Sequence, residues 1–543
     1  MQLSFAQEKT VTGVVSDGSG PVPGANVVVK GTKSGVQTDF DGKYTIKAKA
    51  GDVLVFSFVG MADGSVKVGA SNKIDFKLEQ SDRALEEVVV IAYGSSKKSS
   101  YTGSATQIKA EALEDRALTN VLTGIEGAVS GVQVQSAAGQ PGSSPSVRIR
   151  GFSSISGSNT PLYILDGVPF TGDISTINTA DVESMSILKD AASTSLYGSK
   201  AANGVVIITT KRGKSDNDKF TLNISSGLTS RSIPEYERVN AYQYYPLIWE
   251  AIRNSRPMGT PAELAAANAL ASANVFPLLV NNPFNVPNNS IVGLDGKLNP
   301  NAKLLYEGDL DWEKQISRAG VRRSADFSYQ GRTERTDYYV SLSHLNEEGN
   351  IIGSSFERTT ARMNVNSKFK EWFKTGINLT GVITDSNNAV DGGDNTSSFN
   401  NPFRTIRYMG PIYPVLKHDA TGAVIYDAAG NPVYSDIRGS GASNGRNVIY
   451  ETKNNIDANE GMTLGARTYV EFKFLKSFTF KSNLALDRSQ TNNVTYWNTV
   501  IGDGAPDGYA ARDNFIRNGL TFNQILEYTK SVNNHNISAL LGH

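Results

Sequence analysis

Few residues in this sequence have the types and spacing for chemistry, and none of them completes a reactive group. Gly441-Ala442-Ser443-Asn444-Gly445 has the spacing of a nucleophile elbow, which would present a serine for acyl transfer. An elbow needs a strand before it and a helix after it, whereas this segment lies among Ser, Gly and Asn in a long loop. Arg212-Gly213-Lys214-Ser215 ends like a phosphate-binding loop, but Ile208 occupies the position of its first glycine. We therefore assign neither activity.

The sequence also offers few side chains that could bind a metal or act as a nucleophile. The chain has no cysteine and only 4 histidines, which are spread too far apart for a local zinc motif. Asp166 and Asp190 could suggest acid–base work, but turn formation and helix capping explain such carboxylates better. With 53 basic and 53 acidic residues, no net field favours nucleic acid. We expect no catalytic residue, no cofactor, no metal and no nucleic-acid partner.

The first 79 residues predict the end of a secretory signal, followed by a small β-sandwich. Ser4-Phe5-Ala6 resembles the end of a secretory signal, so residues 1–6 are interpreted as its remnant and 7–79 as the domain. Its turns include Pro23-Gly24 and Asp41-Gly42, the second read as a hairpin turn and not as a calcium loop. The pattern Gly13-Val14-Val15, Pro23-Gly24-Ala25-Asn26-Val27, Gly42-Lys43-Tyr44 resembles the carboxypeptidase-regulatory-like domain. The expected strands are Thr10–Val15, Ala25–Val29, Lys43–Lys47, Val53–Phe58 and Lys73–Leu78.

Residues 80–100 read as a polar linker with one hydrophobic island. The island is Glu86-Glu87-Val88-Val89-Val90-Ile91-Ala92-Tyr93-Gly94. An isolated strand of this kind is costly to leave exposed. Taken alone, it is best explained as an additional edge strand of the sandwich. The segments that follow in the sequence suggest another role for this island.

Residues 101–213 mix short strands with short helical signals and predict a compact α+β unit. Helical signals lie at Leu113–Ile125 and Asp190–Tyr197. The expected strands are Val132–Gln135, Val147–Arg150, Leu162–Leu165, Met185–Leu188 and Val205–Thr210. Ordered strings, among them Val147-Arg148-Ile149-Arg150-Gly151 and Leu165-Asp166-Gly167-Val168-Pro169, resemble the plug domain of TonB-dependent receptors of the SusC/RagA family. Plug residues carried over on these strings are Arg148, Arg150, Gly151, Asp166, Gly167, Lys189, Asp190, Tyr197, Gly198, Asn203 and Gly204.

From residue 214 to 543 the pattern changes to long strands of strict period two. In Arg335–Leu345, for example, Tyr338, Val340 and Leu342 share one face while Tyr339 and Ser341 fall on the other. Short connections alternate with long ones, as in an outer-membrane barrel. The fold class predicted is mainly β: a small β-sandwich, an α+β plug and the first part of a large antiparallel transmembrane β-barrel. The nine expected strands lie near 219–230, 322–331, 335–345, 357–368, 371–385, 461–474, 477–490, 519–530 and 534–542.

The resemblance implies TonB-dependent import of a large nutrient, of the oligosaccharide or peptide class, across the cell outer membrane. It makes Glu86–Gly94 the TonB box, which together with the N-terminal domain would lie in the periplasm. The partners implied are TonB with its energising complex, a SusD-like surface lipoprotein, outer-membrane lipid and the nutrient. Plugged transporters have about 22 strands, so roughly 13 more are expected beyond this sequence. The alternative is a non-transporting outer-membrane receptor or adhesin.

Aromatic residues in the long connections 231–321 and 386–460 are the weak candidates for ligand contact. They could stack on sugar rings or contact peptides, and they could equally pack the loops themselves. The candidates are Tyr242, Tyr244, Tyr245, Trp249, Tyr408 and Tyr413.

Overall fold

The structure is a computed structural model in which the chain forms two compact units. One unit holds residues 1–90 and 94–102, and the other holds residues 91–93 and 103–543. The residues that it describes are 8–18, 20–32, 34–58, 61–78, 88–91, 94–97, 105–114, 116–135, 140–190, 194–214, 218–389, 401–439, 443–532 and 535–543.

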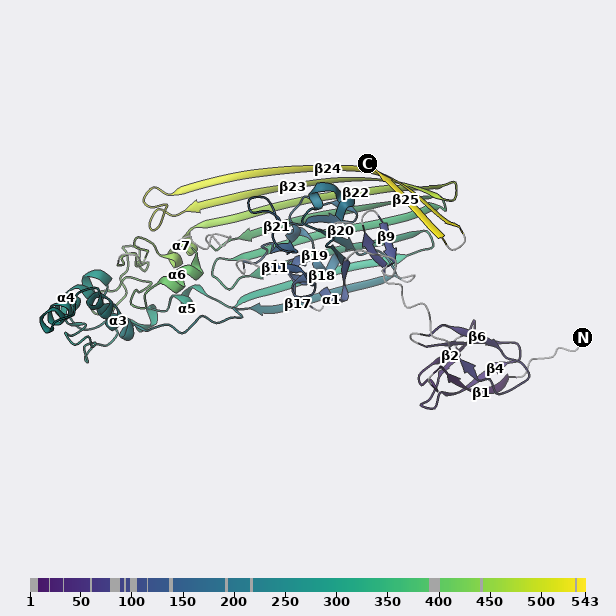
Figure 1. The fold of residues 1–543 in the computed structure, drawn as a ribbon, viewed down its shortest axis with the longest axis horizontal. Coiled ribbons are helices and arrows are strands. Elements are labelled where there is room, and N and C mark those ends of the chain that lie inside the picture. The colour runs from purple at the N-terminus through teal and green to yellow at the C-terminus, as the bar shows by residue number, and fades with distance from the viewer. Residues whose placement is uncertain are drawn as a thin grey trace, which may run out of the picture. The chain divides into compact units, whose positions relative to one another are not determined.

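The first unit contains the expected β-sandwich (Figure 1). One sheet has the order β4-β1-β7, from Lys43–Lys49, Glu8–Ser16 and Phe76–Lys77; the other has the order β3-β2-β5-β6, from Gly35–Gln37, Asn26–Val29, Val53–Ser57 and Gly64–Lys67. Alternate residues of both sheets, such as Ile46 and Phe56, are buried in one hydrophobic core. The sequence misses β3 and β6 because neither short strand carries an apolar run.

The Asp41-Gly42 turn differs from the expected hairpin. Asp39 accepts hydrogen bonds from the N–H groups of Asp41 (3.0 Å) and Lys43 (2.8 Å), and Gly42 has φ +70°. This Asx-type turn carries the chain from β3 in one sheet to β4 in the other, so the flanking strands are not paired. Across the described residues no cluster of acidic or histidine side chains could hold a metal ion.

The hydrophobic island forms strand β8, Val88–Ile91, which shares a two-stranded sheet with β9, Gly94–Lys97. The sheet orders of the described strands do not include β8 in either sandwich sheet, so they do not support the edge-strand reading. Glu86, Glu87, Ala92 and Tyr93 lie outside the described residues.

The plug is built on a five-stranded sheet of order β10-β15-β16-β13-β14, with a separate β11–β12 pair. The two expected helices are much shorter than the sequence suggested: α1 covers Glu111–Glu114, and 3-10 turns cover Val121–Ile125 and Ser195–Ala201. Gly198 has φ +67°, which a regular helix cannot contain. The strands are β10 (Ala105–Lys109), β11 (Val132–Gln135), β12 (Ser146–Ile149), β13 (Leu162–Leu165), β14 (Val168–Pro169), β15 (Val182–Leu188) and β16 (Val205–Thr210).

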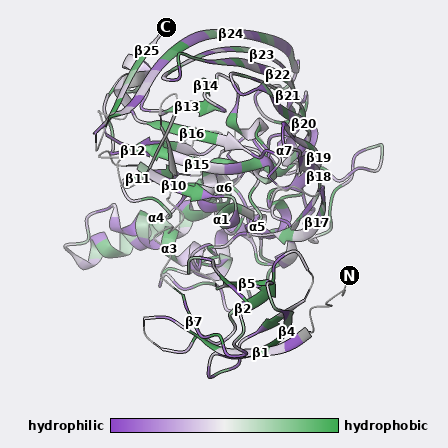
Figure 2. Ribbon diagram, turned by 90° about the vertical axis from the view of Figure 1, so that its right-hand side faces the viewer, coloured by the Kyte–Doolittle hydropathy of each residue, from purple (hydrophilic) through white to green (hydrophobic). Residues whose placement is uncertain are grey.

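The nine strands predicted after residue 214 are confirmed in number and order. They form one antiparallel sheet in which every strand pairs with its sequence neighbour. Figure 2 shows this sheet curving around the plug strands. The strands are β17 (Lys219–Thr229), β18 (Gly320–Arg332), β19 (Thr336–Glu348), β20 (Ser355–Lys370), β21 (Phe373–Asn387), β22 (Ile456–Phe474), β23 (Phe478–Trp497), β24 (Tyr509–Val532) and β25 (His535–Gly542).

In this sheet the apolar face is exposed and the polar face is covered, which is the reverse of a sheet in a soluble protein. Apolar side chains such as Ile224 (75 % exposed) and Leu342 (54 % exposed) point outward. Polar side chains at the alternate positions, such as Ser343 and Arg362, are buried beneath the plug. A sheet with its apolar face exposed and its polar face covered has the lipid-out, lumen-in pattern of an outer-membrane barrel.

The long connections are more structured than the sequence suggested. The β17–β18 connection contains α3 (Ala241–Asn254), α4 (Pro261–Leu279) and α5 (Trp312–Ile316), and the β21–β22 connection contains α6 (Pro402–Tyr408) and α7 (Val448–Asn454). Helix α4 has the length and mean hydropathy of a membrane-spanning helix. It lies within the long connection between β17 and β18.

The sandwich core predicts that residues 8–78 fold on their own. Replacing buried Phe56 by Ala in this isolated domain should lower the free energy of unfolding by about 3–5 kcal/mol, because it removes a core ring. Phe40 is 97 % exposed, so Phe40→Ala should change stability by no more than about 0.5 kcal/mol. Thermal and urea unfolding followed by circular dichroism measure both. Similar losses in the two variants would argue against the core described here.

Candidate functional site

The Asp166-Gly167 motif forms a tight turn between β13 and β14. Leu165 pairs with Val168, and the two residues between them have φ +50° and +86°. Two consecutive positive φ values define a type I′ hairpin turn, for which Asp-Gly is a favoured sequence. The expected turn is confirmed, and it places the Asp166 carboxylate against the wall of the barrel.

The Asp166 carboxylate joins the plug to strands β20 and β21. It accepts hydrogen bonds from Arg362 (2.6 Å), from Asn378 (2.6 Å) and, within the plug, from the N–H of Thr210 (2.9 Å). Both charged side chains are almost fully buried. A buried ion pair is tolerated when further hydrogen bonds satisfy its partners, and here Thr210 Oγ1 also accepts from Arg362 (2.9 Å). We call this cluster of Asp166, Thr210, Arg362 and Asn378 the anchor.

A second contact of β20 with the plug uses a cation to hold backbone carbonyls. Arg358 is buried and donates to the carbonyl oxygens of Thr119 (3.1 Å), Ser175 (2.6 Å) and Ile177 (3.3 Å). These carbonyls belong to loops and 3-10 turns that have no ladder to satisfy them. The guanidinium therefore replaces the water that would otherwise solvate this edge of the plug.

A third contact joins the plug to β18 and β19. Tyr339 donates its hydroxyl proton to Asp181 (2.8 Å), and Asn178 donates to Asp326 (3.1 Å) and Ser343 (3.0 Å). Asn178 also caps the 3-10 turn Thr179–Asp181, because its side-chain Oδ1 accepts a hydrogen bond from the Ala180 N–H. None of these barrel residues was predicted from the sequence to contact the plug. Polar residues at every second position of β20 indicate an inward face, and this pattern could have identified its plug contacts.

The other glycine and arginine plug residues build its own turns. Arg150 and Gly151 both have positive φ, 58° and 89°, after β12. Gly204 has φ +91°, and a Cβ there would lie 2.7 Å from Ile149 Cδ1. These residues serve the fold of the plug.

The remaining plug residues make local contacts. Lys189 donates to the Ser130 carbonyl (3.1 Å), and Asn203 donates to the Ser158 carbonyl (2.8 Å). The Arg148 guanidinium lies over the ring of Phe152. The carbonyl of Asp190 accepts from the Thr194 N–H (3.1 Å), and Tyr197 lies in the turn Ser195–Ala201.

Above the anchor, the plug and the wall enclose an open cavity of about 720 Å³. The plug contributes loops 140–144 and 173–176, and the wall contributes residues of β20 to β24. Most lining side chains are Ser, Thr, Asn and Gln, with Asp173 and Arg517 as the charged members. Such a surface offers many neutral donors and acceptors and little net charge. We call this cavity the vestibule.

Comparison with known proteins supports the same division of the chain. Residues 97–205 match the TonB-dependent Receptor Plug Domain, and residues 11–90 match the CarboxypepD_reg-like domain. TonB-dependent receptor P26 of Formosa agariphila is 31% identical over 99% of this chain and 49% of its own length. TonB-dependent receptor SusC of Bacteroides thetaiotaomicron is 34% identical over 69% of this chain and 34% of its own length. A solved structure of the RagAB peptide importer in the open-open state superposes with TM-score 0.63 and 25% identity, over 84% of this chain and 48% of that one.

The chain belongs to the SusC/RagA-type TonB-dependent receptors. This is a family of outer-membrane receptors and not of enzymes. The chain spans about half the length of the curated relatives that it matches nearly end to end.

Three of the six aromatic ligand candidates are core residues of the receptor's external loops. Tyr245, Trp249 and Tyr413 are buried in one cluster formed by the β17–β18 and β21–β22 connections. Their polar atoms are occupied: Trp249 Nε1 donates to Ser272 (2.8 Å), the Tyr413 hydroxyl donates to the Leu279 carbonyl (3.0 Å), and the Tyr245 hydroxyl donates to the Asn281 carbonyl. These three side chains therefore pack the loops, which is the second of the two roles that the sequence left open for them.

The other three candidates differ in exposure. Tyr242 packs against Phe284 at the edge of the loop core, and Tyr244 is half-buried. Tyr408, at the end of α6, is 72 % exposed. Tyr408 therefore stays the candidate with the most accessible ring.

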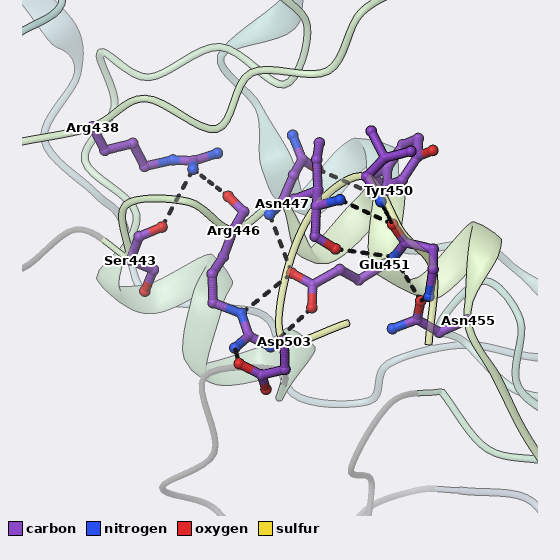
Figure 3. A network of polar contacts seen from close by, with 11 residues as sticks. Arg438, Ser443, Arg446, Asn447, Tyr450, Glu451, Asn455 and Asp503 are labelled. Atoms are coloured by element: carbon purple, nitrogen blue, oxygen red, sulfur yellow. Dashed lines mark hydrogen bonds and ion pairs between the residues drawn. The ribbon is translucent and has the colours of Figure 1, made fainter. Parts of the chain in front are cut away.

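A polar cluster around Glu451 joins a further external loop to this core (Figure 3). Glu451 in α7 is buried and accepts hydrogen bonds from Arg446 (2.8 Å) and from the N–H of Asn447 (3.2 Å). Arg446 also pairs with Asp503, which belongs to the β23–β24 connection. Asn455 accepts from the N–H of Asn498 (2.9 Å) at the other end of α7. Two contacts thus tie the β23–β24 loop to α7.

The anchor predicts a specific loss of plug stability. Arg362→Met leaves the Asp166 carboxylate buried without its cation, and breaking a buried pair in this way costs about 3–5 kcal/mol. The urea concentration at which proteases cleave the plug of the full-length receptor should fall. Lys214→Met removes the more exposed Lys214–Glu183 pair and should cost at most about 1 kcal/mol. An equal effect of the two substitutions would contradict the anchor.

The loop cluster predicts a pH dependence. Burial raises the pKa of Glu451 to about 7, against the opposing effect of Arg446. The folded loop therefore binds a proton that the unfolded loop releases between about pH 4.5 and 7, so its stability should fall as the pH rises through this window. Protease cleavage of the 498–508 loop should become faster across this range. Glu451→Gln, which cannot titrate, should flatten the profile; an unchanged profile would exclude Glu451 as its cause.

Proposed function

We propose that the receptor takes part in TonB-energised import of a large nutrient across the outer membrane. The observation that carries the proposal is a plug held inside a lipid-out, lumen-in sheet by buried polar contacts. Polar contacts suit a plug that must move, because water and the nutrient can replace each hydrogen bond during passage. Water and the nutrient could not replace the contacts of a hydrophobic interface in this way.

We further propose that Val88–Ile91 is the segment that TonB binds. As strand β8 of a two-stranded sheet, it has one edge of backbone groups that β9 does not pair. An extended segment of this kind can add to a strand of the partner by β-augmentation, in which main-chain hydrogen bonds provide most of the affinity. The polar residues before and after it in the sequence would act as a tether that transmits the pulling force to β10.

The partner outside the cell is proposed to be a SusD-like lipoprotein. The importer whose structure this chain resembles is described as RagAB, a peptide importer. The large folded external loops of this chain, with α3 and α4 at their end, would provide the surface on which such a lipoprotein rests.

The nutrient class we propose is a neutral or weakly charged oligosaccharide or peptide. The vestibule supports this class through its many hydroxyl and amide side chains and its balanced charge. Hydroxyl-rich or amide-rich polymers find both donors and acceptors on such a surface. A receptor or adhesin that does not transport would not need to bind TonB through Val88–Ile91. Substitutions in this segment therefore distinguish the two functions.

The proposal predicts different effects of two substitutions at Val89 in the full-length receptor. Val89→Pro removes a backbone donor and fixes φ, so binding of the purified C-terminal domain of TonB should fall at least about tenfold, equivalent to about 1.4 kcal/mol. Val89→Thr keeps the donor and the β propensity and should bind almost as well as the native residue. Isothermal titration calorimetry measures both affinities.

The same pair of variants separates transport from a structural role. Growth on a panel of oligosaccharides and peptides, compared with a receptor deletion, identifies a nutrient that depends on the receptor. Val89→Pro should abolish that growth while the sandwich of residues 8–78 melts at an unchanged temperature. Normal growth of the proline variant would refute TonB-driven import through this segment.

A further inference from the structure

A groove of about 780 Å³ lies on the outer, lipid-facing side of the wall and crosses strands β19 to β24. Two neighbouring rows of outward side chains line it, and within each row every residue pairs with the next one across the sheet. None of the described plug residues lines the groove, and Leu486 and Leu520 in it are 50 % and 69 % exposed, which places it on the outer surface. The first row is Val340, Met363, Leu379, Ala466, Leu486 and Leu520, and the second is Ala361, Gly381, Leu464, Arg488 and Asn518.

Small residues make this surface hollow. Ala361, Gly381 and Ala466 lie within the two rows, among the longer side chains of leucines and Met363. A Cβ at Gly381 would lie 3.7 Å from Leu464 Cδ2, which is an ordinary contact, so no neighbour requires a glycine there. The effect of the small residues is to leave space. The volume of the groove lies within the range of about 300–1,000 Å³ that small-molecule sites occupy.

The groove runs obliquely from the periplasmic side of the wall toward the external side. At one end, Val340 is close to Thr336, the periplasmic end of β19. At the other end, Leu520 lies near the middle of β24, which has 24 residues against 13 in β19. Because the short turns mark the periplasmic rim, the rows climb away from that rim as they cross the strands. The two polar outward residues, Arg488 and Asn518, lie at the raised end, so the groove is apolar along most of its length and polar at its external end.

Arg488 is a charged side chain that faces lipid without a partner. It is exposed and forms neither a hydrogen bond nor an ion pair with any described residue. On β23 it stands between outward Leu486 and outward Gln490, at the border of the apolar belt. By contrast, Arg512, which is outward on β24, lies 3.6 Å from Glu460. A charge that faces lipid is costly unless an opposite charge meets it, and a bound anion would relieve this cost at Arg488.

We propose that the groove binds one phosphate-bearing lipid of the membrane, with an acyl chain along the two rows and the phosphate on Arg488. The planar guanidinium matches two phosphate oxygens at once, and the Asn518 amide supplies a further donor. Charge and shape agree with this occupant, because the cation stands at the external end and the apolar rows lead from it toward the middle of the belt. A free phosphate ion would leave the apolar rows uncovered.

Native mass spectrometry of the detergent-purified full-length receptor tests the phosphate contact. The probes are dioleoyl phosphatidylglycerol and dioleoylglycerol, which have the same acyl chains and differ in the phosphoglycerol group. The native receptor should retain one phosphatidylglycerol, and Arg488→Leu should bind it at least about tenfold more weakly, equivalent to about 1.4 kcal/mol. Dioleoylglycerol should bind the two proteins equally. Arg488→Lys keeps the charge without the planar fork, so its affinity for phosphatidylglycerol should lie between those of the native receptor and Arg488→Leu.

A matched control keeps the loss of charge and moves it out of the groove. Arg512→Leu also removes an outward arginine, but this residue does not line the groove and pairs with Glu460. Its affinity for phosphatidylglycerol should equal that of the native receptor. If Arg488→Leu does not give a heat-modifiable barrel, Arg488→Gln takes its place with the same expected loss.

A second substitution fills the groove without changing any charge. Gly381→Phe places a ring in the open space, whereas Ile224→Phe adds a ring on the outward side of β17, away from the groove. Gly381→Phe should lower the affinity for both lipids at least about tenfold, and Ile224→Phe should change neither. Inorganic phosphate equimolar with the lipid should not displace phosphatidylglycerol from the native receptor.

Three results would overturn the inference: native affinity in a folded Arg488→Leu or Arg488→Gln receptor, an equal loss in Arg512→Leu, or lipid retention that Gly381→Phe leaves unchanged. Displacement of the lipid by equimolar phosphate would show a site for a free anion and would contradict a lipid site. The test uses neither TonB nor a nutrient, so its outcome is independent of the proposed import.

Discussion

The structure depends on one constraint, namely that a strand crossing lipid must turn its apolar side chains outward and its polar ones inward. Leu342 and Ile224 satisfy the outward half of this constraint, and Arg358, Arg362 and Asn364 satisfy the inward half. Inward polar groups are stable only where water or another polar surface meets them. The plug provides that surface. On the plug, Asp166 and the loop carbonyls that Arg358 binds are the polar groups that meet these inward side chains.

This requirement explains why the contact between plug and wall is polar and uneven. Buried ion pairs contribute little net stability compared with apolar packing, yet breaking one partner is costly. Such a contact fixes the position of the plug precisely without making its release impossible once water enters. Its cations are Arg358 and Arg362 on β20, which bind loop carbonyls and Asp166, while Asn178 adds hydrogen bonds to β18 and β19.

Much of this architecture could be predicted from the sequence, because period-two alternation and turn residues are local signals. All nine wall strands and the Asp166-Gly167 turn follow from such signals. The partners of Asp166 do not, since Arg362 and Asn378 lie 196 and 212 residues away and only the folded register brings them together. The fold of the external loops could not be predicted from local sequence patterns either. Tyr245 and Tyr413 look like surface aromatics in polar loops, but two connections fold together around them.

The N-terminal part of the plug illustrates the same limit on a smaller scale. Strand β10, Ala105–Lys109, has no marked apolar run and is stabilised by its pairing with β15. Within the helix expected at Leu113–Ile125, Asn120 caps a separate 3-10 turn, and the helix expected at Asp190–Tyr197 is replaced near its end by a 3-10 segment, Ser195–Ala201, that is kinked at Gly198. Where tertiary contacts decide a conformation, propensity alone does not identify it.

The central claim is that buried polar contacts hold the plug inside the wall, with the anchor fixing β16 and the β13–β14 turn to β20 and β21. Hydrogen–deuterium exchange of the resting full-length receptor tests it most directly, because exchange reports the free energy of local opening. We predict that backbone amides of β16 and of the β13–β14 turn exchange slowest in the plug, and that those of the edge strand β10 exchange clearly faster. Uniform protection across the plug, or slower exchange at β10 than at β16, would contradict the account.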